Sequence, residues 1–193
     1  YAIKFGWVDM KDTKFDNIAE DIQTLNERAL RGEYEIVAIS FALYPHIKDD
    51  YAPLRTAVSF GEGYGPKLIK LKDAKLKRNF KVALSGEHTT NAMLFRIAYP
   101  DARITYMNFL EIEQAVLDGV VDAGVLIHES ILTYDSALEV EREMWDIWQE
   151  LAGDDLPLPL GGMAISRSIP LNKAIDYERT LTKAVHVARE HKE

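Results

Sequence analysis

Two polar stretches of the sequence follow apolar runs directly and carry side chains that could do chemistry. His128 and Glu129 come after the apolar run 122–127, and the stretch 85–91 reads SGEHTTN. Imidazole exchanges protons near neutral pH, so His128 is a candidate general acid or base. The alternative interpretation is a histidine that is merely exposed where a strand ends.

The stretch 85–91 favours an anion site. Gly86 allows a tight turn, and Thr89 or Thr90 can cap a following helix, whose first N–H groups and positive dipole end then face the crevice. Such a helix end suits a carboxylate or a phosphate. Because the stretch contains no Lys or Arg, a single carboxylate fits better than a triphosphate. Plain helix capping is the alternative.

Apolar spacing predicts the elements that must position these residues. Helices are expected over 16–30, 89–98, 109–118, about 141–151 and from about 170, and strands over 35–41, 81–85, 103–107, 122–127 and 162–166. The alternation of strands and helices from 81 to 127 predicts a parallel sheet with right-handed crossovers. The near-continuous apolar run 35–41 predicts a further buried parallel strand.

Ligands bind in open α/β sheets at the carboxyl ends of the strands. This rule adds Ser40, at the end of the strand predicted over 35–41, to Thr90 and His128. We therefore expect all three residues at the same end of their strands.

The glycine-rich run Gly61–Pro66 lies between two short apolar segments of 54–71. It lacks the Lys and Ser/Thr of a phosphate-binding loop and does not open a helix. The run therefore predicts a turn between a strand and a returning strand, as a hairpin turn or as a flap over the crevice.

Helix boundaries and faces give further expectations. Asp16 suits the N-cap of the first helix and Gly32 its C-terminal stop. The acidic stretch 139–143 is expected to form a solvated helix face. Trp145 and Trp148, three residues apart, are expected to belong to the core.

The composition is that of an ordinary globular protein, with 193 residues, 47% of them hydrophobic and 28% charged, and a net charge of -8. The acidic balance argues against a nucleic-acid partner.

The absence of cysteine excludes disulfides, thiolate zinc sites and a cysteine nucleophile. His128 and Glu129 lack the second histidine of a zincin helix, so no metal is expected. No apolar run approaches ~18 residues and no leader argues for export, so we expect no membrane span and a cytoplasmic location.

The order of the elements predicts an α/β fold of two lobes. The first comprises 1–77 and 167–193, and the second comprises 78–166. The chain begins at Tyr1 rather than Met, and its last predicted helix has no stop signal. We therefore expect a piece of a longer protein, truncated at both ends.

Four motifs resemble the 1,4-dihydroxy-6-naphthoate synthase family in order and in spacing. They are SFGEGYGP at 59–66, HTT at 88–90, DAGVLIHE at 122–129 and LPLPLG at 156–161. The stretch 21–28 also resembles the family's first helix, so the resemblance spans nearly the whole chain. Each motif is modest alone, and the four together are fairly specific.

The resemblance implies a fold like the type II periplasmic binding proteins, with two α/β lobes of mixed or parallel sheets flanked by helices, and a substrate cleft between them. It also implies a lyase that needs no metal and no redox cofactor. Members of this family convert cyclic dehypoxanthine futalosine to 1,4-dihydroxy-6-naphthoate in menaquinone biosynthesis, by base-initiated carbon–carbon cleavage.

By the same resemblance, His128 is the proton acceptor. The substrate, a small-molecule carboxylate, contacts the strand end Ala38, Ile39 and Ser40 and the helix start Thr90 and Asn91. Asn91 departs from the small residue usual in the family, which affects the fit of the substrate. The family's first strand and its C-terminal helical part have no counterpart in the chain.

Two alternatives stay open. One is chorismate dehydratase, an enzyme of the same pathway with a similar fold, and the other is a non-catalytic solute-binding protein of that fold. The run Gly61–Pro66 and the pair His128 and Glu129 favour the naphthoate synthase over the dehydratase.

Overall fold

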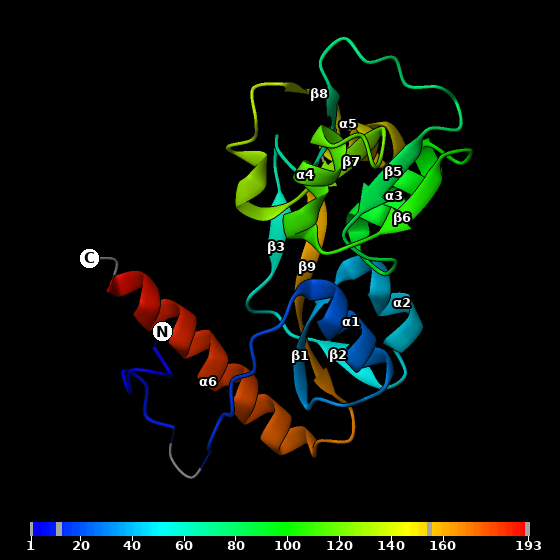
Figure 1. Ribbon diagram of the computed structural model, residues 1–193. Coiled ribbons are helices and arrows are strands. Elements are labelled where there is room, and N and C mark those ends of the chain that lie inside the picture. The colour runs from blue at the N-terminus through cyan, green and yellow to red at the C-terminus, as the bar shows by residue number, and fades with distance from the viewer. Residues whose placement is uncertain (1, 11–12, 154–155, 192–193) are drawn as a thin grey trace. The chain divides into compact units, whose positions relative to one another are not determined.

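A computed structural model describes residues 2–10, 13–153 and 156–191 of the chain. The chain divides into two compact units (Figure 1). Unit 1 is Tyr1–Ser59 with Gly161–Glu193, and unit 2 is Phe60–Leu160. No helix within the described residues is both long enough and apolar enough to cross a bilayer.

Unit 1 is built on a sheet in which β9 lies between β1 and β2, and both neighbours run antiparallel to it. The strand predicted over 35–41 is thus present, but the prediction that it is parallel was wrong. A buried antiparallel strand gives the same apolar run as a buried parallel one. The elements of this unit are α1 (Ile22–Leu30), β1 (Ile36–Ser40), η1 (Phe41–Leu43), α2 (Tyr44–Ile47), β2 (Tyr51–Pro53), most of β9 (Leu158–Ser166) and α6 (Leu171–Glu190).

Helix α1 begins later than the sequence predicted. The carboxylate of Asp21 accepts hydrogen bonds from the backbone N–H groups of Gln23 (3.0 Å) and Thr24 (3.1 Å), so Asp21 rather than Asp16 is the N-cap. Gly32 follows the helix with a φ of +67°, which confirms it as the stop.

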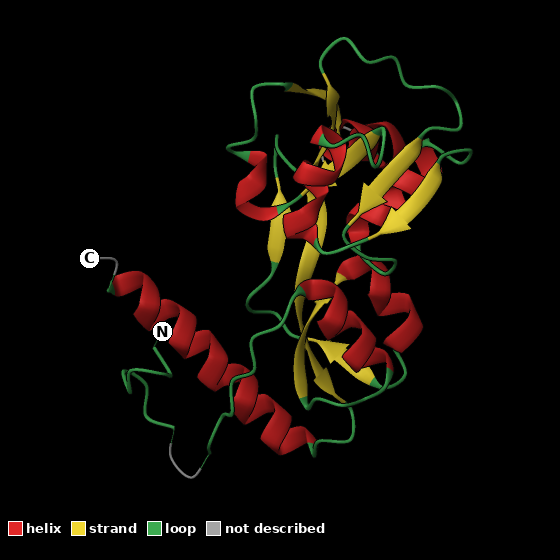
Figure 2. Ribbon diagram, viewed as in Figure 1, coloured by secondary structure: helices red, strands yellow, loops and turns green. Residues whose placement is uncertain are grey.

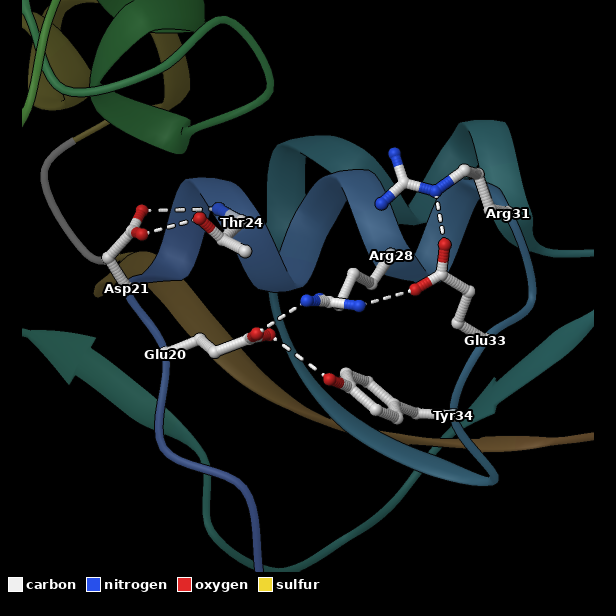
Figure 3. A network of polar contacts seen from close by, with 7 residues as sticks. All are labelled: Glu20, Asp21, Thr24, Arg28, Arg31, Glu33 and Tyr34. Carbon is white, nitrogen blue, oxygen red and sulfur yellow. Dashed lines mark hydrogen bonds and ion pairs between the residues drawn. The ribbon is translucent and has the colours of Figure 1, made fainter.

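A network of polar contacts holds α1 to the chain around it (Figure 3). The Arg28 guanidinium binds the carboxylates of Glu20 and Glu33, both at 2.7 Å, and Tyr34 donates its hydroxyl hydrogen to Glu20 at 3.2 Å. Arg31 pairs with Glu33 as well. The hydrogen bonds from Arg31 and Arg28 hold the pKa of Glu33 below its ordinary value. The network therefore fixes the segments on both sides of α1.

Helix α6 is one uninterrupted helix that starts after Pro170 (Figure 2). Its Ala184 packs with Ala2 and Val8 from the beginning of the chain in a small apolar cluster. The predicted last helix is thereby confirmed, with Pro170 at its N-cap.

Unit 2 is built on a mixed sheet with the strand order β6-β5-β7-β4-β8. Strand β5 runs parallel to both β6 and β7, which confirms the predicted parallel arrangement, whereas β4 runs antiparallel to β7 and β8. The elements are β4 (Lys67–Leu71), β5 (Lys81–Leu84), α3 (Thr90–Ala98), β6 (Arg103–Tyr106), η2 (Phe109–Glu111), α4 (Ile112–Leu117), β7 (Ala123–Leu126), η3 (His128–Ile131), β8 (Leu138–Glu143) and α5 (Met144–Ala152).

Two expectations about unit 2 were wrong. The acidic stretch 139–143 belongs to strand β8, where Lys70 of β4 forms ion pairs with Glu139 (2.8 Å) and Glu141 (3.3 Å). The run Gly61–Pro66 does not close a hairpin, because β3 (Ser59–Gly61) pairs with β9 whereas β4 pairs with β7 and β8. In both cases the sequence pattern was local and the pairing partner distant.

The core of unit 2 has two parts. One contains Val82 and Leu84 of β5, and the other contains Ala83 of the same strand, as expected when alternate side chains point to opposite faces. Trp145 and Trp148 pack against the first cluster, so the prediction that they belong to the core is confirmed.

Candidate functional site

The start of α3 is a cluster of buried polar side chains. Thr89 is the N-cap, and its hydroxyl oxygen accepts a hydrogen bond from the backbone N–H of Ala92 at 3.3 Å. The one hydroxyl hydrogen of Thr89 lies within bonding distance of the Gly86 carbonyl (2.8 Å) and of the Asn91 side-chain oxygen. Of the two predicted candidates for the cap, Thr89 and Thr90, the structure shows Thr89 to be the N-cap.

Thr90 and Asn91 form the first turn of α3, and both are buried. Thr90 donates its hydroxyl hydrogen to the carbonyl of Leu160 at 3.0 Å, and the Asn91 amide donates to the Ser85 hydroxyl at 3.3 Å. These bonds hold the side chains in place. The first turn of a nine-residue helix also carries N–H groups without intrahelical acceptors and the positive end of the helix dipole. This turn can therefore attract a carboxylate.

His128 follows β7 with Ile127 between them and opens η3 with an exposed side chain. Its backbone has a φ of +54°, in the left-handed region that residues other than glycine rarely adopt. The Phe109 ring packs edge-on against the imidazole, with ring centroids 5.1 Å apart and an angle of 72° between the planes. Ser130 donates its hydroxyl hydrogen to the Ile127 carbonyl at 2.7 Å and fixes the turn. His128 is thus an accessible imidazole on a constrained backbone.

The sheet of unit 2 brings two of the candidate groups to one edge. Because β5 and β7 are parallel neighbours, their carboxyl ends meet at the same edge, where α3 begins and where His128 follows β7. A base and an anion-attracting helix end at one edge could bind an acidic small molecule and remove a proton from it.

The other three candidates belong to β1 of unit 1. Ile39 is part of the core, and Ala38 is half-buried. Ser40 is buried at the carboxyl end of the strand and forms two hydrogen bonds with Asn26 of α1. Its hydroxyl accepts from the Asn26 amide at 3.1 Å, and its backbone N–H donates to the Asn26 side-chain oxygen at 2.9 Å.

Sequence reasoning missed Asn26, which is fully buried. Asn26 lies four residues after Ile22 and three before Ala29, so it belongs to the apolar face of α1. A polar residue on such a face needs a buried partner, and that signal could have identified it.

Unit 1 also has a shallow hollow of about 370 Å³ on α6. The Arg55 guanidinium pairs with the Glu178 carboxylate at 3.1 Å, and this contact holds the pKa of Glu178 below its ordinary value. None of the candidate residues contributes to the hollow, and the residues that line it are Arg55, Glu178, Arg179, Thr182, Lys183 and His186. Among the described residues, no three His, Asp or Glu side chains gather in a group that could hold a metal ion.

Comparison with solved structures shows the fold class. A crystal structure of an Archaeoglobus fulgidus protein is 36% identical in sequence, with a TM-score of 0.92 that covers 100% of this chain and 72% of that one. An amino acid transporter substrate-binding protein from Streptococcus pneumoniae, bound to L-arginine, is only 12% identical but has a TM-score of 0.58 over 88% of this chain and 68% of its own. The predicted likeness to periplasmic binding proteins is confirmed.

Comparison of sequences shows the family. A curated relative from Streptomyces coelicolor, named 1,4-dihydroxy-6-naphthoate synthase, is 38% identical over an alignment of 157 residues that covers 77% of this chain. The chain spans about half of that relative, 55% of its length. The family model described as menaquinone biosynthesis matches residues 1–193. The chain therefore belongs to the menaquinone biosynthesis family.

Proposed function

We propose that the chain carries the base and the carboxylate-binding helix end of a 1,4-dihydroxy-6-naphthoate synthase. This enzyme is a carbon–carbon lyase that converts cyclic dehypoxanthine futalosine to 1,4-dihydroxy-6-naphthoate. The observation that carries the proposal is the exposed, backbone-constrained His128 at the sheet edge where α3 also begins. The similarity to the Streptomyces coelicolor relative supports the same reaction.

In the proposed mechanism, the substrate carboxylate lies at the first turn of α3, near Thr90 and Asn91. His128 accepts a proton from a hydroxyl group of the sugar portion. The electron pair of that O–H bond forms a carbonyl while the adjacent carbon–carbon bond breaks, as in a retro-aldol reaction. The pair released by the broken bond goes to the ring system, which becomes aromatic. General-base catalysis of this kind contributes roughly 10²–10⁴-fold to the rate.

Ala38, Ile39 and Ser40 are proposed to contact the substrate as well. The Ser40 hydroxyl accepts from Asn26, and a hydroxyl that accepts one bond can still donate its own hydrogen. Ser40 can thus donate to a substrate oxygen without giving up its bond to Asn26.

The test uses protein expressed from its complete reading frame. It is incubated separately with cyclic dehypoxanthine futalosine and with chorismate, and the aromatic product is followed by its absorbance and by mass spectrometry. We expect 1,4-dihydroxy-6-naphthoate from the first incubation and no product from the second. A product from chorismate alone would overturn the proposal in favour of the dehydratase. The sequence-based expectation of a cytoplasmic location is checked by cell fractionation.

A binding role without turnover is the second candidate. The similarity of the fold to a transporter's substrate-binding protein favours it. Calorimetry with cyclic dehypoxanthine futalosine separates the two roles, because heat of binding without any product would identify a binding protein.

A further inference from the structure

We propose that Phe109 is a positioning residue whose ring sets the orientation of the His128 imidazole. The inference rests on the proposed function, because the orientation of His128 matters for turnover only if this residue is the base. The contact that motivates it is the edge-on packing of the two rings, 5.1 Å apart at 72°. Aromatic pairs favour such an arrangement over other orientations of the same rings.

Phe109 can direct the imidazole because its own position is fixed. It is half-buried and packs against both core clusters of unit 2, one with Leu84 and the other with Ile112. The residue before it is fixed as well, since the Asn108 side chain accepts from the N–H of Leu110 at 3.0 Å and the Asn108 carbonyl accepts from the N–H of Glu111 at 3.0 Å. The Phe109 ring is therefore held in one position at the carboxyl edge of the sheet.

His128, by contrast, is exposed and has few restraints on its side chain. The backbone is set by its left-handed φ and by the hydrogen bond from the N–H of Leu132 to the Glu129 carbonyl at 2.9 Å. Two side-chain torsions of His128 then decide where its nitrogens point. The Phe109 ring contacts one side of the imidazole and selects among those torsions. A base held in a productive orientation spends less of its time in orientations from which no proton is transferred.

The experiment compares Phe109→Leu with Phe109→Tyr and with a matched control, Phe80→Leu. Phe80 is a buried ring in the same unit that packs against Phe95 and Tyr99, so its loss removes a similar volume away from His128. Steady-state kinetics gives kcat and KM for each variant. Proton–carbon NMR spectra report the chemical shifts of the His128 ring, which are assigned by comparison with His128→Gln.

We expect Phe109→Leu to lower kcat about 2- to 10-fold with KM within twofold of the parent. Its His128 ring protons should lose the ring-current shift caused by Phe109. Phe109→Tyr should retain both the rate and the shift. Phe80→Leu should lower the stability of the fold and leave kcat and the His128 shifts unchanged.

Two results would overturn the inference: unchanged His128 shifts in Phe109→Leu, or an equal loss of kcat in Phe80→Leu. If the parent protein makes no product, the proposed function fails instead. The NMR comparison still decides whether the Phe109 ring packs against the imidazole, which the inference requires, because it needs no turnover.

Discussion

The carboxyl ends of β1 and β7 present their polar residues in opposite ways. Ser40, at the end of β1, is buried, and Asn26 binds both its hydroxyl and its backbone N–H. His128, after the end of β7, is exposed on a left-handed backbone. The first residue is held by satisfied hydrogen bonds, whereas the second is held in a backbone conformation that costs energy.

The difference teaches how far the rule of strand ends can be used. The rule concerns parallel sheets, and it selected both residues from the sequence. Only unit 2 meets its condition, since β5 and β7 are parallel while β1 pairs with β9 antiparallel. The sheet topology therefore supports a ligand site at the end of β7, whereas a ligand site at Ser40 is supported only by the family resemblance.

The largest expected effect is on activity. Replacing His128→Ala should lower kcat/KM by roughly 10²–10⁴-fold, because the base is lost, while substrate binding by calorimetry persists. Ser40→Ala is the comparison at the other strand end and should lower kcat/KM by about tenfold or less. Equal losses in the two variants would show that the two ends do not differ in role.

The second effect is on stability at the end of β1. Asn26→Ala should lower the free energy of unfolding in urea by about 1–3 kcal/mol, because the buried N–H and hydroxyl of Ser40 lose their partner. Glu27→Ala, at the next position and exposed, is the control and should change it by less than about 0.5 kcal/mol. A loss in Asn26→Ala no larger than in this control would mean that Ser40 is not held by Asn26.

The third effect is on stability. The difference in free energy of unfolding between a glycine and an alanine variant should have opposite signs at the two strand ends. The variant His128→Gly should be more stable than His128→Ala by about 1 kcal/mol, because glycine adopts the left-handed conformation without steric cost. Ser40 lies in an extended strand, so Ser40→Gly should be less stable than Ser40→Ala by about 0.5–1 kcal/mol. Urea titrations of the four variants check this, and the same sign at both positions would contradict the account of strain at His128.

The smallest effect concerns pH. Burial raises the pKa of Asp21, but the hydrogen bonds from Thr24 and Gln23 outweigh it and hold the pKa below its ordinary value. The cap thus contributes fully above about pH 4 and is lost as the pH falls through the lowered pKa. Because α1 carries Asn26, acid should lower the protection of the Ser40 N–H against hydrogen exchange, measured relative to the intrinsic rate at each pH, more than at the start of α3. Asp21→Asn should remove the acid sensitivity, and its persistence in this variant would exclude Asp21 as the cause.

The parallel part of unit 2 could be predicted because its strands follow one another with a helix between them. Its pattern is local, so apolar spacing was sufficient. Strand β1 could not be placed in the same way, because Ser40 pairs with Gly161 and Ile36 with Ile165, far along the chain. The apolar run shows burial on both faces but not the direction of the neighbouring strand.

Strand β8 was missed although its sequence carries a signal. Leu138 and Val140 alternate with glutamates, the two-residue period of a strand with one buried face. The charge of the stretch outweighed that alternation in the helix interpretation. The structure explains the glutamates, since Lys70 on β4 pairs with Glu139 and Glu141 across the strands.

The candidate site was predictable in its residue types and not in its backbone. The stretch SGEHTTN predicted a cap at Thr89 or Thr90, because a threonine before a helix is a strong capping signal, and Thr89 is the cap. Nothing in the type of His128 indicates a left-handed φ, which depends on the turn that follows β7. Direct contact of any of these residues with a substrate stays a prediction.

The discontinuity of unit 1 has a consequence for synthesis on the ribosome. Unit 2, Phe60–Leu160, is one continuous stretch, whereas β1 must wait for its partner β9 until all of unit 2 has been made. The segment that contains β1 is made before unit 2 but can pair only after it, and until then β1 offers unpaired backbone groups to other chains. A nascent chain should protect unit 2 from protease once Phe60–Leu160 has left the ribosome, while β1 stays accessible to chaperones until β9 has emerged as well.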